Sequence, residues 1–114
     1  MADSKEWKHG TGSPMEVAVG QLRARGVGVT AKAYGFCVSI PLSEGESASG
    51  ECGLASFGDE LELSVKVPHA GVYWFWRPEL PEIVELLVEL VSKASAGGSA
   101  ALIDFLESSA DSRL

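Results

Sequence analysis

The sequence has few of the side chains that catalysis or metal binding usually needs. Its 114 residues include two histidines, His9 and His69, and two cysteines, Cys37 and Cys52. These four residues are isolated from one another, so their spacing is not that of a metal-binding motif. Neither histidine has a patterned nucleophile or acid near it that would indicate a catalytic triad. The sequence therefore predicts no catalytic residue, no cofactor and no metal site. Two cysteines are also too few for a disulfide framework, and we expect free thiols, with a Cys37–Cys52 bridge as the alternative.

Other signals of enzyme chemistry are weak. The Gly26-Val27-Gly28 segment precedes a predicted strand, whereas a phosphate loop precedes a helix, and no Gly-Lys-Ser/Thr occurs. The paired carboxylates Glu44/Glu46 and Glu60/Glu62 fall in a predicted loop and on a predicted polar strand face. General acid or base catalysis needs a carboxylate held in a dry cleft. The sequence does not favour an enzyme, although a pocket assembled from distant residues remains an alternative.

Basic residues are scarce and scattered. Lys and Arg number 9 against 16 Asp and Glu, which gives a formal net charge of −7. Nucleic-acid binding needs a clustered basic surface, so we expect no nucleic-acid partner. The acidic surface is typical of a soluble protein and is also compatible with a basic protein partner.

Long apolar runs are missing as well. The first residues are polar and glycine-rich, unlike a secretion signal. The longest apolar-rich stretch, residues 83–91, is interrupted by Glu85 and Glu89 and is shorter than the ~20 residues that cross a bilayer. We expect a cytoplasmic protein with no membrane partner.

Periodicity predicts one α+β domain. Hydrophobic residues make up 46% of the chain, which is typical of a globular protein. Residues 60–67 alternate strictly between apolar and polar, as a half-buried strand does. The fold class that we predict is an N-terminal helix, an antiparallel four- to five-stranded β-meander and two C-terminal helices. We expect a disordered arm at residues 1–12, a single domain at 13–110 and a polar tail at 111–114. Within the domain we expect helices at 14–25, 82–95 and 99–109, and strands at 27–33, 36–42, 60–67 and 72–77. Residues 43–53 are expected to form a loop, and a short strand is possible at 53–57.

Residues 72–77 place aromatic rings on both sides of one strand. Because side chains alternate, one face carries Val72, Trp74 and Trp76, and the other carries Tyr73, Phe75 and Arg77. One set belongs to the core, and the other projects from an otherwise polar face. Three elements could cover this second aromatic set: the 99–109 helix, a second copy of the chain, or another partner or ligand.

The 82–95 helix also has a wider apolar arc than one sheet contact needs. Together with the aromatic strand it predicts an interaction surface, since Trp and Tyr are frequent at interface centres. The predicted surface comprises Tyr73, Trp74, Phe75, Trp76, Arg77, Val84, Leu87, Val88 and Val91.

The segments SPMEVAVGQLRARGVGV, DELELSVKV and GVYWFW, followed by an acidic-apolar helix, resemble a group of small actinobacterial proteins of uncharacterised function. The resemblance covers about residues 14–95 and implies a helix, a four-stranded meander that ends in a Trp-rich strand, and a closing helix. The same order is distantly similar to secretion-chaperone and YbjN-like folds, which bind proteins and often dimerise. The resemblance implies no catalytic activity.

These observations predict a non-enzymatic protein-interaction module, homodimeric and similar in role to a chaperone, immunity or regulator-accessory protein. The alternative is a small-ligand-binding protein or enzyme with an apolar pocket between the aromatic strand and the helices. A flat apolar patch at a symmetric interface favours the first, and a deep pocket with converging polar groups favours the second.

Overall fold

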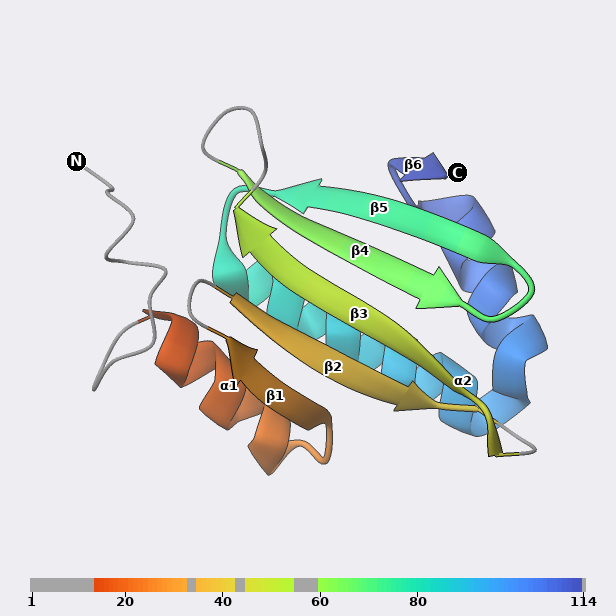
Figure 1. Ribbon diagram of the computed structural model, residues 1–114, viewed down its shortest axis with the longest axis horizontal. Coiled ribbons are helices and arrows are strands. Elements are labelled where there is room, and N and C mark those ends of the chain that lie inside the picture. The colour runs from red at the N-terminus through yellow and green to blue at the C-terminus, as the bar shows by residue number, and fades with distance from the viewer. Residues whose placement is uncertain (1–13, 33–34, 43–44, 55–59, 114) are drawn as a thin grey trace.

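The computed structural model describes residues 14–32, 35–42, 45–54 and 60–113. These residues form one six-stranded antiparallel sheet in chain order, with helices on one face (Figure 1). The predicted α+β class with an antiparallel sheet and an N-terminal helix is confirmed. The elements are α1 (Pro14–Ala24), β1 (Gly28–Lys32), β2 (Gly35–Pro41), β3 (Ser47–Leu54), β4 (Leu61–Val67), β5 (Gly71–Arg77), α2 (Leu80–Ser109) and β6 (Ser112–Arg113).

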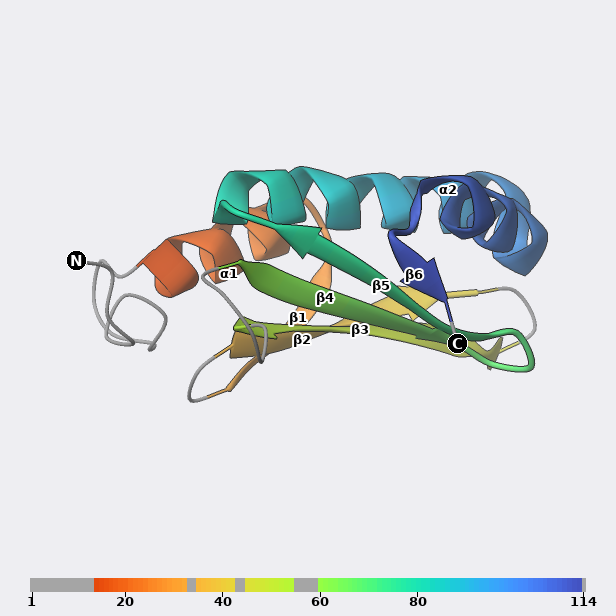
Figure 2. The ribbon, with the colours of Figure 1, turned by 90° about the horizontal axis from the view of Figure 1, so that it is seen from above.

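The molecule has two layers. Figure 2 shows α1 and α2 above the sheet, and the other side of the sheet has no described helix over it. The core lies between the layers, where inward-facing side chains of β2, β4 and β5 meet the buried face of α2. Burying these side chains is the main force that holds the layers together.

Helix α1 ends where its sequence predicts. The apolar residues of its buried face recur at helical spacing, and Gly26 follows at φ 84°. The N–H of Gly26 donates to the Arg23 carbonyl at 3.1 Å, and the N–H of Val27 donates to the Leu22 carbonyl at 3.0 Å. This pair of bonds is a Schellman cap, in which glycine tolerates the left-handed conformation.

The predicted count of two C-terminal helices is not matched, although a kink divides α2 where the sequence predicts a break. A single 30-residue helix, α2, runs from Leu80 to Ser109 and bends at Gly98, whose φ of 69° and ψ of −158° are not helical. Glycine adopts this conformation at little cost, so one residue changes the direction of the helix without a connecting loop. The bend turns the last part of α2 toward β5 and β6 (Figure 1).

The prediction of a loop at 43–53 is also wrong, because β3 begins at Ser47 and pairs with β2 and β4 on its two sides. Ladder hydrogen bonds on both edges outweigh the poor strand propensity of Ser and Gly. The inward positions are small because α2 crosses close above them. A Cβ on Gly50 would lie 2.8 Å from Val38 Cγ2 and 3.4 Å from Leu87 Cδ2.

The predicted polar tail contains a further strand. Residues 112–113 form β6, which pairs with Tyr73 and Trp74 of β5. The N–H of Asp111 donates to the Trp74 carbonyl, and the Asp111 carboxylate accepts from the N–H of Trp76, both at 2.9 Å. These contacts close part of the outer edge of β5, which would otherwise leave strand hydrogen-bonding groups unpaired.

The close approach of β3 and α2 predicts a steric cost at Gly50. Gly50→Ala should lower the free energy of unfolding by about 1–3 kcal/mol, because the new methyl group meets the branched, stiff side chain of Val38. The measurement is urea unfolding at equilibrium. Gly20→Ala is the control, since Gly20 is exposed on α1 with open space around it and should gain up to about 1 kcal/mol. Unchanged stability of Gly50→Ala would contradict the packing described here.

Candidate functional site

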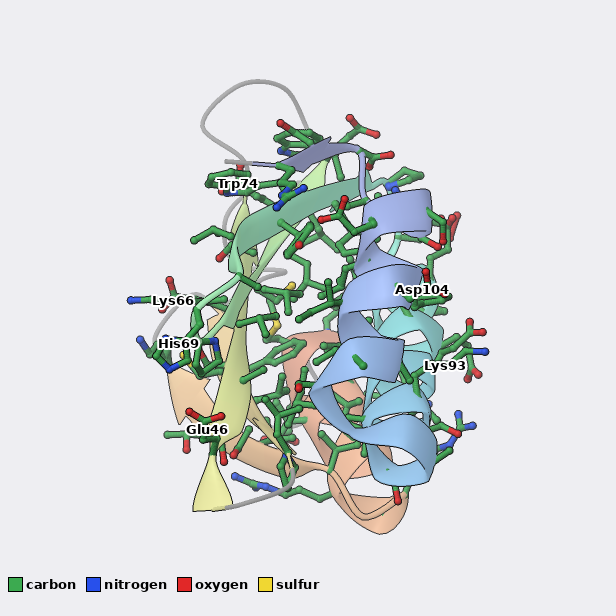
Figure 3. All side chains as sticks on the ribbon, turned by 90° about the vertical axis from the view of Figure 1, so that its right-hand side faces the viewer. Glu46, Lys66, His69, Trp74, Lys93 and Asp104 are labelled. Atoms are coloured by element: carbon green, nitrogen blue, oxygen red, sulfur yellow. The ribbon has the colours of Figure 1, made fainter. Side chains whose placement is uncertain are left out.

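The candidate site is the side of the sheet that faces away from α1 and α2. We call it the open face. In Figure 3, Trp74 and Lys66 project on this side, whereas Lys93 and Asp104 project from the outer side of α2. No described helix or strand covers the open face. The strand registers place on it Thr30 and Lys32 of β1, Cys37 and Ser39 of β2, Ser49, Glu51 and Gly53 of β3, Glu62, Ser64 and Lys66 of β4, and Val72, Trp74 and Trp76 of β5.

Strand β5 divides its aromatic rings between core and surface. Tyr73 and Phe75 are fully buried beneath α2, and Trp74 and Trp76 are half-buried on the open face. The last part of α2 buries Leu102 on the core side of the sheet. The 99–109 segment therefore lies on the opposite side from the two tryptophans and does not cover them.

Several residues of the predicted interaction surface belong to the core. Tyr73 and Phe75 are buried beneath the helices, and Val84 and Leu87 are buried between α2 and its neighbours. These four side chains offer no surface to a partner, so the predicted surface is corrected to exclude them. The sequence pattern could not separate the two faces of β5, because both carry large aromatic rings.

The wide apolar arc of α2 has a structural explanation. The helix packs both on the sheet and against α1, so two contacts share the arc. Val88 and Val91 are half-buried at the margin of this packing. An ion pair of 2.6 Å between Arg25 and Glu85 lies at the same α1–α2 junction, exposed to solvent. The arc is therefore not a surplus surface.

The ring of Trp76 is held in place by a hydrogen bond. Its indole Nε1–H donates to Glu62 Oε2 at 2.9 Å, across the β4–β5 pair. Arg77 lies on the other side of the strand, where its guanidinium is 2.7 Å from the Asp111 carboxylate and 5.6 Å from the centre of the Phe75 ring. The open face thus presents Trp76 in a fixed orientation, whereas Arg77 lies on the side of β5 that carries Phe75.

The carboxylate of Asp111, the residue before β6, contacts both Trp76 and Arg77 of β5. Partial burial acts to raise its pKa, but the hydrogen bond from the N–H of Trp76 and the charge of Arg77 outweigh it, so the pKa of Asp111 is lowered. The carboxylate is therefore ionised at neutral pH and keeps both contacts.

A polar cluster occupies the other half of the open face. Lys32 Nζ lies 2.9 Å from Glu51 Oε2, and the Cys37 thiol donates to the same oxygen at 3.4 Å. The hydrogen bond from Lys32, followed by that from Cys37, lowers the pKa of the Glu51 carboxyl, and the bond to Glu51 raises the pKa of Lys32. This half of the face is polar and exposed to solvent.

A shallow hollow of about 290 Å³ lies between the polar cluster and β5. The hollow is shallow because two of its lining residues, Ser49 and Ser64, have small side chains. Ser64 is the cross-strand neighbour of Trp74. The small residues of β3 and β4 thus leave space beside Val72 of β5. The hollow is lined by Cys37, Ser49, Gly50, Glu51, Ser64, Lys66 and Val72.

A larger hollow of about 500 Å³ lies elsewhere, between α2, the turn after α1 and the end of β2. The alternative prediction places an apolar pocket between the aromatic strand and the helices, where Tyr73, Phe75 and Leu102 are fully buried. The larger hollow is lined by Gly26, Gly28, Ser39, Pro41, Leu42, Val91, Ala94, Ser95 and Gly98.

The other sequence candidates are dispersed. His69 is in the turn before β5, with Nε2 3.4 Å from Glu46 Oε2, and both side chains are exposed. His9 and Glu44 lie outside the described residues. Among the residues that the structure describes, no three His, Cys, Asp or Glu side chains are grouped to hold a metal ion.

By length and composition alone, α2 could also cross a membrane. The core helix of a soluble protein meets the same criterion, and α2 packs its inward face on the sheet. This feature therefore does not distinguish a membrane span from a core helix.

No protein-family model, curated protein or solved structure matches this chain. The resemblance given by its segments stays a prediction.

The two cysteines lie on opposite faces of the sheet and are both free, which rules out the Cys37–Cys52 bridge. Burial raises the pKa of the Cys52 thiol to about 12. We predict that a disulfide reagent at pH 8 reacts with Cys37 in the folded protein and with Cys52 only after denaturation, because the thiolate is the reactive form. Cys37→Ser is the control and should remove the native reaction. Rapid labelling of native Cys52 would contradict its burial.

Proposed function

We propose that this chain is a non-enzymatic protein-interaction module that binds another polypeptide through the open face. The observation that supports it is the pair Trp74 and Trp76, held half-buried on a sheet surface that no described element covers. Their polar surroundings, made of Ser, Thr, Glu and Lys, are typical of the rim around an interface centre.

The geometry of the two tryptophans suits binding. Indole rings are enriched at interface centres, because they bury a large area at a small cost in side-chain freedom. The hydrogen bond from Trp76 to Glu62 reduces that cost further, since the ring is already oriented. Strand β5 lies between β4 and β6, so its backbone is well supported.

We further propose a cytoplasmic homodimer that acts as an accessory to other proteins, in the manner of a chaperone, immunity or regulator-accessory protein. A basic protein remains the alternative partner, since the whole chain carries a net charge of −7.

The larger hollow supports the second candidate function, the binding of a small ligand. Its volume of about 500 Å³ is within the range of ligand pockets. Its lining is mostly glycine and apolar, and its polar residues are two serines, Ser39 and Ser95. Such a lining offers few groups to orient a substrate, so we place this candidate second.

The two faces of β5 should respond differently to truncation. Trp74→Ala should leave a folded protein that loses about 1 kcal/mol or less, because the indole is only half-buried. Phe75→Ala should lose about 3–5 kcal/mol, because it empties a fully buried site. Thermal unfolding measures both, and equal losses would contradict the division of β5 between core and surface.

Photo-crosslinking in cells tests the proposed function. A photoreactive residue at Ser64 on the open face should give a crosslinked polypeptide, and adding Trp74→Ala and Trp76→Ala should abolish it. The same residue at Ser92, exposed on the outer side of α2, is the control and should give none. The proposal fails if Ser92 crosslinks and Ser64 does not, or if the tryptophan variants leave the Ser64 product unchanged.

A further inference from the structure

We propose that the outer edge of β1 binds an extended, acidic segment of another protein, which joins the sheet as a further strand. The edge consists of backbone groups at the side of the sheet, whereas the proposed function uses side chains of the open face. It is thus a second surface, beyond the proposed function and independent of it.

Strand β1 lies at one end of the sheet (Figure 1). One side of β1 pairs with β2, and no described strand pairs with its other side. Ala31 and Lys32 are exposed, and Val29 is half-buried. At the opposite end of the sheet, β6 and Asp111 close part of the edge of β5. The end at β1 is therefore the more open of the two.

A contact between Arg23 and Val29 shows which backbone groups face this edge. The Val29 carbonyl oxygen accepts a hydrogen bond of 3.1 Å from Arg23 Nη2, so this carbonyl points away from β2. In an antiparallel ladder the N–H and C=O of one residue point to the same side, and the side alternates along the strand. Val29 and Ala31 therefore both direct their backbone groups outward, where each can donate to and accept from an added strand.

Arg23 makes this edge selective. Its exposed guanidinium covers the Val29 carbonyl, and a charged side chain at an edge is a common device against unwanted strand pairing. A carboxylate is a stronger hydrogen-bond partner for a guanidinium than a neutral carbonyl is. An acidic segment therefore draws Arg23 to itself and releases Val29 for pairing, whereas a neutral or basic segment does not.

The charge of this part of the chain also favours an acidic segment. Residues 17–43 contain Arg23, Arg25 and Lys32 and no Asp or Glu. Their charge of +3 leaves −10 for the rest of the chain, since the total is −7. Arg25 and Lys32 form exposed ion pairs with carboxylates of α2 and β3. Among the described residues, Arg23 has no carboxylate partner, so it is the cation that an incoming acid meets first.

Strand addition of this kind divides affinity from specificity. Backbone hydrogen bonds give the affinity, and alternate side chains of the added strand give the specificity. The side chains of an added strand project either toward the helices, where Arg23 lies, or toward the open face, where Lys32 lies. Acidic residues at every second position of the segment thus meet a cation in either register.

The experiment is an NMR titration of the labelled full chain with the synthetic peptide acetyl-(Glu-Val)4-amide, and with acetyl-(Lys-Val)4-amide as the matched control. The acidic peptide should bind and the basic one should not, even though the net charge of −7 attracts the basic one. The amide signals of Val29 and Ala31 should shift. The Ala31 amide should also exchange about tenfold more slowly at saturation, because its N–H becomes hydrogen-bonded.

Variants of the chain test the two parts of the site. Ala31→Pro removes an outward N–H and no bond to β2, so it should stay folded, as edge strands tolerate proline, and bind the acidic peptide about tenfold more weakly. Thr30→Ala is the control on the same strand and should bind as the wild type does. Arg23→Gln should weaken binding up to about fivefold, as expected for the loss of one exposed ion pair. Circular dichroism checks the fold of each variant.

The other results contradict the edge site. If neither peptide binds, or if both bind equally, an acidic segment is not the occupant. If the signals of Trp74 and Trp76 shift while those of β1 stay constant, the peptide binds the open face, which overturns the edge site and leaves the proposed function standing. If Ala31→Pro does not fold, hydrogen exchange in the wild type decides, and an unchanged rate at Ala31 overturns the strand pairing.

Discussion

The structure depends on one constraint: a single layer of helices covers a sheet whose fifth strand is aromatic on both sides. Side chains of a strand alternate between its two faces, so the helices can bury only one of the two aromatic sets. Tyr73 and Phe75 take the buried positions, and Trp74 and Trp76 are left on the open face. The interaction surface that we propose follows from this geometry.

The same helix layer explains the shape of β3. Helix α2 passes close over the middle of the sheet, and the inward positions Ala48, Gly50 and Cys52 are small enough to permit it. The kink at Gly98 then lets the last part of α2 bury Leu102 and Leu106. The outward positions Ser49 and Gly53 are small as well, and Ser49 lines the hollow of about 290 Å³ on the open face.

The sequence predicted those elements whose periodicity is strong. α1, β4 and β5 follow from regular apolar spacing and clear end signals, and the capping glycine at 26 lies where the pattern places it. β3 was missed because its strand conformation comes from hydrogen bonds to two neighbours, which a stretch of Ser, Gly and Ala does not reveal. The long α2 was divided in two because a pair of glycines usually ends a helix, whereas here only Gly98 leaves the helical conformation.

The candidate site was predictable in part. Alternation shows that Trp74 and Trp76 share a face, but the choice of buried face depends on which side the helices cover, and this is a tertiary property. The small residues Ser49 and Gly53 were missed as site residues, since their meaning appears only when the registers place them in rows with Val72 and Trp76.

Self-association through the open face can be followed by NMR of the labelled protein at several concentrations. Backbone and indole shifts should change with concentration at β3, β4 and β5, Trp74 and Trp76 included, while the shifts of exposed residues of α2 such as Ser92 stay constant. Shift changes confined to the outer side of α2, with the open-face signals constant, would contradict it.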